Sequence, residues 1–242
     1  MRALVAQTRA ETWMTLRRGE TLLLVVGIPV LFLVFFSLVH VLPTGDQQAV
    51  SFLVPGILAL AVMSTAMVSL GIATGFERGY GVLKRLGSTP LGRPRLLTAK
   101  IAMILLVEVV QVAILIPVGI GLGWSAADGA EGGQAIGVAL LATVAFAGIG
   151  LLLAGVLRAE VNLAAANGLY LVLLLLGGMI VPLYKLPSGL ASFARLLPAA
   201  ALSDGLHASL GRGMPVPVHA WVVLAVWAVA APLAAMLTFR WD

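Results

Sequence analysis

Residues 161–183 read VNLAAANGLYLVLLLLGGMIVPL and contain no Asp, Glu, Lys or Arg. A helix of about 20 such residues is long enough to cross the roughly 30 Å hydrocarbon core of a bilayer. The continuous apolar run at 171–176 lacks the alternation of polar and apolar residues that is typical of a membrane β-strand. The stretch therefore predicts a membrane-spanning α-helix, whose backbone polar groups are paired within the segment.

Five further stretches share this length and scarcity of charge. The six predicted spans are residues 21–42, 50–76, 97–123, 134–157, 161–183 and 216–239. The whole chain of 242 residues is 61% hydrophobic and only 10% charged, with a mean hydropathy of +1.08. A soluble domain carries about 25% charged residues, and a disordered segment is polar, so both classes are excluded. We predict an all-α integral membrane protein with one domain over residues 1–242.

The basic residues are distributed unevenly between the two ends of these spans. Twelve of the 15 Lys and Arg residues lie before the first span, between spans 2 and 3, between spans 4 and 5, or after span 6. Because cytoplasmic loops of membrane proteins are enriched in Lys and Arg, we expect both termini and the loop 77–96 to be cytoplasmic.

Two segments outside the spans each allow two interpretations. Residues 1–20 can form an interfacial helix, since Trp13, Arg17 and Arg18 lie near the membrane boundary, or a solvated leader whose arginines only set the topology. Residues 184–215 contain apolar patches that are too short to span and are divided by prolines. They can form a pair of re-entrant helices at the outer side, or a loop that packs flat on the spans.

The loop 77–96, ERGYGVLKRLGSTPLGRPRL, is the sizeable cytoplasmic loop of the predicted topology. Val82, Leu83 and Leu86 can share one side of a short helix, with Lys84 and Arg85 towards another. A short amphipathic helix on a loop can dock on a soluble partner. The alternative is a basic loop that only satisfies the positive-inside rule, and the residues alone leave both open.

Polar residues inside the spans are candidates for a substrate path. Glu108 lies near the middle of span 3, where a carboxylate costs about 3 kcal/mol, and Gln111 follows one turn later on the same face. They either line a path or proton site, or form hydrogen bonds that only hold the helices together. Asn162, Asn167 and Tyr170 in span 5, and Ser64, Thr65 and Ser69 in span 2, can hydrogen-bond between helices.

No catalytic or metal-binding set is predicted from the sequence. The chain has no cysteine, and His40, His207 and His219 lack metal-ligand spacing. It has no G-x-x-x-x-G-K-[ST] motif for nucleotide binding and no G-x-S-x-G or H-E-x-x-H motif. The net charge of +5 does not by itself suggest binding to nucleic acid. Any energy from ATP would therefore come from another polypeptide.

The loop pattern E-R-x-x-G-x-L-K-R-L-x-x-T-P at 77–90, followed by Lys100, resembles the signature of the type-2 ATP-binding-cassette permeases. It is most similar to the daunorubicin/doxorubicin-resistance branch of drug exporters, and the LVPGI stretch at 53–57 is also similar. The resemblance covers essentially the whole chain.

This resemblance implies a permease in the cell (plasma) membrane, active in multidrug efflux and antibiotic resistance. A second permease chain, identical or paralogous, and two separate ATPase subunits would complete it, and the ATPases would bind ATP and Mg²⁺. Residues 1–20 would form a connecting helix, 77–91 a coupling helix and 184–215 re-entrant helices. The residues that the resemblance places at the ATPase are Glu77, Arg78, Gly81, Leu83, Lys84, Arg85, Leu86, Thr89 and Pro90.

Other functions are compatible with the same residues. The cargo can instead be a lipid or a lipid-linked glycan. An intramembrane enzyme that pairs Glu108 with a histidine has poor geometry, because the histidines lie near the outer boundary. A self-sufficient channel lacks a ring of charges along a pore. The candidates for the substrate path are Glu108, Gln111, Asn167 and Tyr170.

Overall fold

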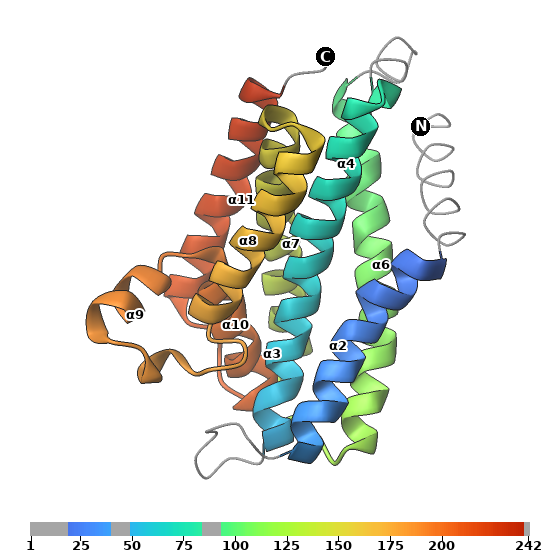
Figure 1. Cartoon of the computed structure of the whole chain (residues 1–242). Helices are drawn as coiled ribbons and strands as arrows, with labels where there is room; N and C mark the ends of the chain where they lie inside the picture. Colours follow the sequence, from blue (N-terminus) through green and yellow to red (C-terminus); the bar gives the residue numbers. More distant parts are fainter. Residues whose placement is uncertain (1–18, 40–48, 84–92, 240–242) are drawn as a thin grey trace.

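The computed structural model describes residues 19–39, 49–83 and 93–239, and the side chains of 19–24 and 93–98 are not described. In this part of the chain the regular structure is entirely helical (Figure 1). The elements are α2 (Gly19–Val39), α3 (Ala49–Met63), η1 (Ser64–Ser69), α4 (Leu70–Gly79), α6 (Arg93–Gly121), α7 (Gly132–Val156), α8 (Ala159–Leu176), η2 (Leu183–Lys185), α9 (Ser188–Ala194), α10 (Pro198–Leu206), η3 (His207–Gly211) and α11 (Val218–Thr238).

Five helices in the described residues are long and apolar enough to cross a membrane. They comprise the continuous helix Ala49–Gly79, the part Ala99–Gly121 of α6, and α7, α8 and α11. The described apolar part of α2, Val25–Val39, is a shorter helix of the same character. Each of these six helices overlaps one of the predicted spans, so the prediction of an all-α membrane protein is confirmed.

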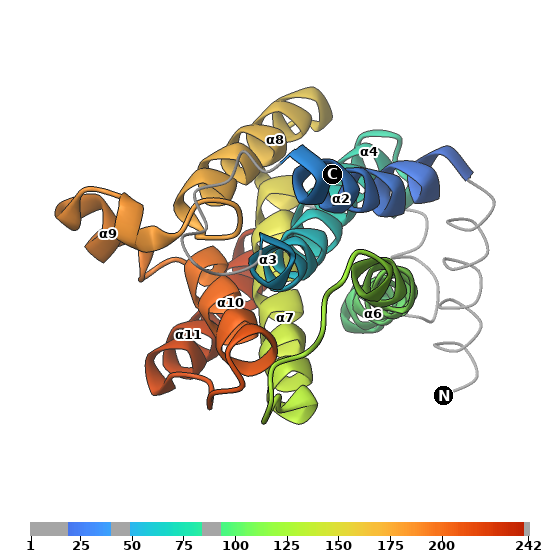
Figure 2. The ribbon, with the colours of Figure 1, turned by 90° about the horizontal axis from the view of Figure 1, so that it is seen from below.

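The second helix, Ala49–Gly79, forms the centre of the bundle. In Figure 2 it is surrounded by α2, α6, α7 and α8, and α6 and α8 lie on opposite sides of it. Its middle section, η1, is a wide π-helical turn, which is a rare element that often marks a functional position. A Cβ atom at Gly150 of α7 would lie 2.5 Å from the Met67 carbonyl oxygen of this turn. The glycine therefore allows the two backbones to touch.

A second close backbone contact joins α7 to α11. A Cβ atom at Gly148 would lie 2.5 Å from the ring Cδ of Pro232. Small residues at such crossings let membrane helices approach closely and gain van der Waals contact. The two contacts of α7, at Gly150 and Gly148, hold α11 and the central helix on either side of it.

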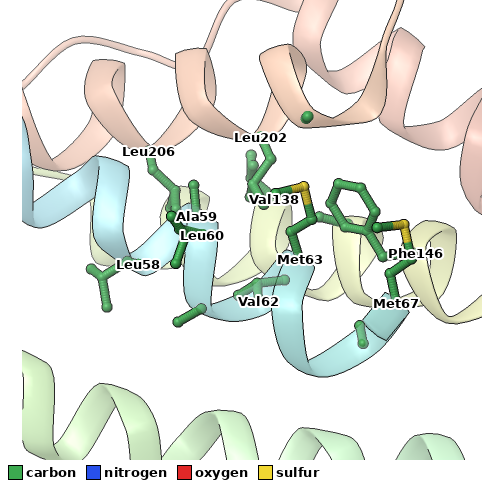
Figure 3. Packing of buried hydrophobic residues seen from close by; sticks show 14 of the residues in the cluster. Leu58, Ala59, Leu60, Val62, Met63, Met67, Val138, Phe146, Leu202 and Leu206 are labelled. Carbon is green, nitrogen blue, oxygen red and sulfur yellow. The ribbon is translucent and has the colours of Figure 1, made fainter. Parts of the chain in front are cut away.

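Buried apolar side chains fill the space between α3, α7 and α10 (Figure 3). Met63 and Met67 lie against Phe146 of α7, while Leu206 of α10 lies above Ala59 and Leu60 and Leu202 lies above Met63. All six of the large side chains in this group are at most 3% exposed. The helix α10 is therefore part of the core.

The fifth span ends seven residues earlier than the predicted end at 183. The helix α8 stops at Leu176, and Gly178 follows with φ +69°, a conformation that favours glycine. The chain then crosses α3 in direct contact, because a Cβ atom at Gly56 would lie 2.0 Å from the Met179 carbonyl oxygen. The glycine pair and this crossing, rather than loss of hydrophobicity, end the helix.

The two short helices of the outer segment have different positions. The helix α10 packs against α3, α7 and α11, with Ala199, Ala200 and Leu202 fully buried. The helix α9 projects from the bundle instead (Figure 1). One of the two predicted re-entrant helices thus enters the helical bundle, and how deeply either enters the bilayer stays a prediction. The predicted connecting helix 1–20 lies almost wholly outside the described residues.

Candidate functional site

The loop signature begins at the end of α4, where Glu77 meets a lysine of the next helix. The Nζ atom of Lys100 in α6 donates a hydrogen bond to Oε2 of Glu77 at 2.6 Å. The Lys100 side chain is 1% exposed and that of Glu77 is 29% exposed. Because a buried ammonium group requires a charged or polar partner, this ion pair fixes α4 relative to α6.

The next residue, Arg78, connects α4 to α7. One guanidinium nitrogen donates to the Gly155 carbonyl oxygen at 2.6 Å, and the other donates to that of Leu157. The Gly155 oxygen belongs to the last turn of α7, where carbonyl groups have no partner within the helix, and Leu157 is the residue just after the helix. The guanidinium group of Arg78 therefore caps the end of α7 with two hydrogen bonds. We name Glu77, Arg78 and Lys100 the inner tether.

The residues that follow the inner tether begin an exposed loop. Gly81 adopts φ +69°, and Tyr80 and Val82 are 75% and 39% exposed. Leu83 is 1% exposed and anchors the loop in its own chain. The predicted docking residues Lys84, Arg85, Leu86, Thr89 and Pro90 lie outside the described residues.

Glu108 and Gln111 belong to a buried group of polar side chains. The amide oxygen of Gln111 accepts a hydrogen bond from the Thr65 hydroxyl of η1 at 3.1 Å. Its amide nitrogen donates to the Val25 carbonyl oxygen of α2 at 2.9 Å. We name Thr65, Glu108, Gln111 and Thr143 the polar cluster.

Glu108 reaches α7 instead of α2. Oγ1 of Thr143 lies 2.7 Å from Oε2 of Glu108 and 2.9 Å from the Ala139 carbonyl oxygen. A hydroxyl group has one hydrogen, so both contacts are hydrogen bonds only when the Glu108 carboxyl group carries a proton. Oε1 of Glu108 is buried and has no hydrogen-bond partner among the described residues. The polar cluster therefore joins α2, η1, α6 and α7, and its Glu108 Oε1 atom is the acceptor without a hydrogen bond.

The other two substrate-path candidates lie apart from this cluster. Asn167 is exposed on α8 and donates to the Leu163 carbonyl oxygen of its own helix at 2.8 Å. Tyr170 on the same helix is half-buried against the core. Because α8 and α6 lie on opposite sides of the central helix (Figure 2), the four candidates do not form one site.

The packing role predicted for Asn162 is confirmed. Its side chain is fully buried and donates to the Gly71 carbonyl oxygen of α4 at 2.8 Å. Among the side chains described, those of residues 25–39, 49–83 and 99–239, no group of three His, Asp or Glu could hold a metal ion.

The inner tether was not predicted, although its three residues were all named. Lys100 was read only as part of the signature, and Arg78 as a contact for a partner. The usable signal was the position of two opposite charges, Glu77 and Lys100, at the same ends of consecutive spans that are joined by the loop 77–96.

The all-helical bundle, with its long apolar helices and its buried polar cluster, defines a multi-pass membrane protein. The family model described as ABC-2 type transporter matches residues 2–210. The chain therefore belongs to the ABC-2 type transporter family, whose members form the membrane domains of ATP-binding-cassette permeases. No curated protein matches the chain significantly.

Proposed function

We propose that the chain is the membrane subunit of an exporter that moves hydrophobic, drug-like or lipid-like molecules with energy from separate ATPase subunits. Two ATPase subunits and a second permease chain would complete the assembly. The chain itself has no nucleotide-binding P-loop, so ATP and Mg²⁺ would be bound by the partner. In this arrangement both termini and the loop 77–96 face the cytosol.

The observation that carries this proposal is the inner tether. It joins the start of the loop to α4, α6 and α7 through charged hydrogen bonds at both Glu77 and Arg78. A partner that moves this loop would therefore displace the inner ends of three helices together, and not the loop alone. Such a rigid link is what a coupling element requires, because a change of facing needs differential contacts in the two states.

The polar cluster supports a role in the change of facing. It connects α2, α6 and α7 at the π-helical turn of the central helix, where the backbone geometry is already irregular. A sliding of α6 against these helices would exchange these hydrogen bonds. Glu108, with its unpaired Oε1, would then be the group that meets a polar part of the cargo or a water molecule.

Docking is tested at the exposed residues of the loop. The tagged chain is purified from its native host, and Mg²⁺-dependent ATP hydrolysis in the purified fraction is measured. We expect Val82→Asp and Tyr80→Ala to remove this activity, because a charge or a missing ring at an exposed contact disrupts the interface. Leu83→Asp is unsuitable, because Leu83 is buried and its substitution would disturb the fold.

The matched control is Val218→Asp, which places the same charge on an exposed valine at the opposite end of the bundle. It should leave the ATP hydrolysis unchanged. Equal hydrolysis in Val82→Asp and in the unmodified chain would contradict docking at this loop.

Coupling is tested separately at Arg78. Arg78→Lys keeps the charge but cannot reach both carbonyl oxygens of α7, since an ammonium group lacks the guanidinium fork. We expect the ATPase to remain bound while substrate-stimulated ATP hydrolysis in proteoliposomes falls at least about threefold. Arg158→Lys, an exposed arginine at the same end, is the control. Full stimulation in Arg78→Lys would refute the transmission role of the inner tether.

A further inference from the structure

At the end opposite the inner tether, the outer segment, α3 and the start of α11 border an open pocket of about 890 Å³. Besides Tyr184, its ionisable lining groups are Arg195, Asp204, His207, Arg212 and His219. Two permanent positive charges thus face one carboxyl group. No carboxylate of the described residues forms an ion pair with either guanidinium group.

Asp204 does not neutralise this charge fully. Burial raises the pKa of Asp204, while Arg212, Arg195 and His219 oppose that shift. Burial lowers the pKa of His207, which reduces its positive charge. The balance of the pocket is therefore positive, and it is carried by the two exposed arginines, which are chemically suited to bind a phosphate group.

The walls of the pocket are held in place by hydrogen bonds to backbone atoms. Nε2 of His207 lies 3.0 Å from the Phe52 carbonyl oxygen of α3, which ties η3 to the central helix. Nε2 of His219 lies 2.9 Å from the Arg195 carbonyl oxygen, and Nε1 of Trp227 donates to the Leu196 carbonyl oxygen at 2.9 Å. The end of α9 is thus attached to α11, and these two hydrogen bonds fix the position of the Arg195 backbone.

The rim beside Arg195 is strongly apolar. Leu190, Phe193 and Leu196 recur every three residues on and just after α9, and they are 41%, 55% and 60% exposed. In a chain that spans a membrane, such a row on a helix that projects from the bundle fits the lipid boundary. Phe52, Pro182 and Leu183 continue the apolar surface into the pocket.

From these features we propose that the pocket binds the anionic phosphate head of a membrane amphiphile from the outer leaflet. The head group pairs with Arg195 and Arg212, while the start of its acyl chains lies along the exposed row of α9. Tyr184 and His219 offer further hydrogen bonds to a polar head. Binding needs neither ATP nor a second chain, so it can fail while the proposed transport function stands.

The test uses the full chain, purified in a neutral detergent. Native mass spectrometry measures the binding of phosphatidylglycerol and of phosphatidylcholine with identical acyl chains. We expect phosphatidylglycerol to bind at least about tenfold more tightly, because only its head carries a net negative charge. Equal affinities would overturn the proposal.

Variants then locate the bound lipid. The double variant Arg195→Gln/Arg212→Gln should lower the affinity for phosphatidylglycerol to that for phosphatidylcholine, and Arg195→Lys/Arg212→Lys should retain part of it. Lys185 is not one of the lining residues, and its Nζ atom lies 5.7 Å from the centre of the Tyr184 ring at the pocket edge. Lys185→Gln removes this positive charge and keeps both arginines, so it should change the affinity less than twofold. An unchanged affinity in the double glutamine variant would place the lipid elsewhere and refute the proposal.

A final arm separates the lipid from a free ion. Inorganic phosphate should displace phosphatidylglycerol only at concentrations about a hundredfold higher than those of the lipid, because the ion gains nothing from the apolar row. Displacement at equal concentration would overturn the role of the amphiphile. Since both arginines are exposed, unchanged thermal unfolding should verify that the variants are folded.

Discussion

The side-chain amide of Gln111 in α6 donates a hydrogen bond to the carbonyl oxygen of Val25 in α2, at 2.9 Å. Val25 precedes Pro29 by four residues, and proline has no N–H group to offer to that carbonyl. The glutamine therefore replaces the backbone hydrogen bond that the proline removes. A proline in one helix and a polar residue in another are thus two parts of one structural solution.

The first prediction concerns this pairing. Gln111→Leu should lower the free energy of unfolding by about 1 kcal/mol or more, because it leaves the Val25 oxygen and the Thr65 hydroxyl without their partner. In a chain that also carries Pro29→Ala, the new N–H group can bond to Val25, so Gln111→Leu should cost less. Unfolding in SDS titrations, measured for the four variants of the cycle, gives both values.

Additive effects of the two substitutions would contradict this account, since they would mean that Pro29 and Gln111 act independently. Asn167→Leu serves as a control for the loss of an amide group from a membrane helix. Its side chain is exposed and bonds only within α8, so its effect should be close to zero.

The second prediction concerns the inner tether, whose two charged partners differ in burial. Glu77→Gln takes the carboxylate away from an ammonium group that is 1% exposed, whereas Lys100→Met leaves a carboxylate that is 29% exposed and can still meet water. Glu77→Gln should therefore be the more destabilising of the two, by about 1 kcal/mol or more.

The double variant Glu77→Gln/Lys100→Met should be more stable than Glu77→Gln alone, because it removes the buried charge as well as its partner. Apparent melting temperatures in detergent test the order. A chain with Lys100→Met that melts below the Glu77→Gln chain would show that the ion pair does not determine the stability of this end.

The third prediction concerns pH. Burial lowers the pKa of His207 below its ordinary value of 6.5, while hydrogen bonds to Ser203 and Phe52 oppose this shift and the charge of Arg212 adds to it. The unfolded chain then binds this proton more readily than the folded chain. Stability due to His207 is complete above pH 6.5 and is lost as the pH falls through 6.5 towards the lower pKa of the folded state.

When the pH is lowered from 7.5 to 5.5, the melting temperature should therefore fall further for the unmodified chain than for His207→Gln, which has no titrating ring. Asp204 acts in the opposite direction, because its raised pKa adds stability at low pH that is lost as the pH rises. The comparison of the two chains cancels Asp204. Equal pH dependence in both would exclude His207 as the titrating group.

The spans could be predicted because hydrophobicity and helix length are local properties. The end of α8 could not, because 177–183 remain apolar and the helix stops where the chain must cross Gly56 of α3. The π-helical turn η1 could not be predicted either, since its sequence STAMVS carries no local signal for this geometry. The turn lies where Gly150 of α7 approaches the backbone of Met67.

The polar residues were identified from the sequence, but their partners were not. Glu108 and Gln111 were expected to share one environment, yet one side chain reaches α7 and the other reaches α2 and η1. The bond of the Gln111 amide to the Val25 carbonyl, which Pro29 leaves without a backbone partner, was not predicted. Contacts between distant helices depend on how the helices rotate and cross, which one sequence does not display.

The inner tether also limits how this protein can exchange parts with its relatives by recombination. Residues 77–83 depend on Lys100 and on the last carbonyl groups of α7, which lie about 23 and 77 residues further along the chain. A chimera with a crossover between Glu77 and Lys100 would lose the ion pair unless the new neighbour carried a matching charge, whereas any residue supplies the carbonyl oxygens that Arg78 requires. The loop start and the beginning of α6 are therefore inherited as one unit.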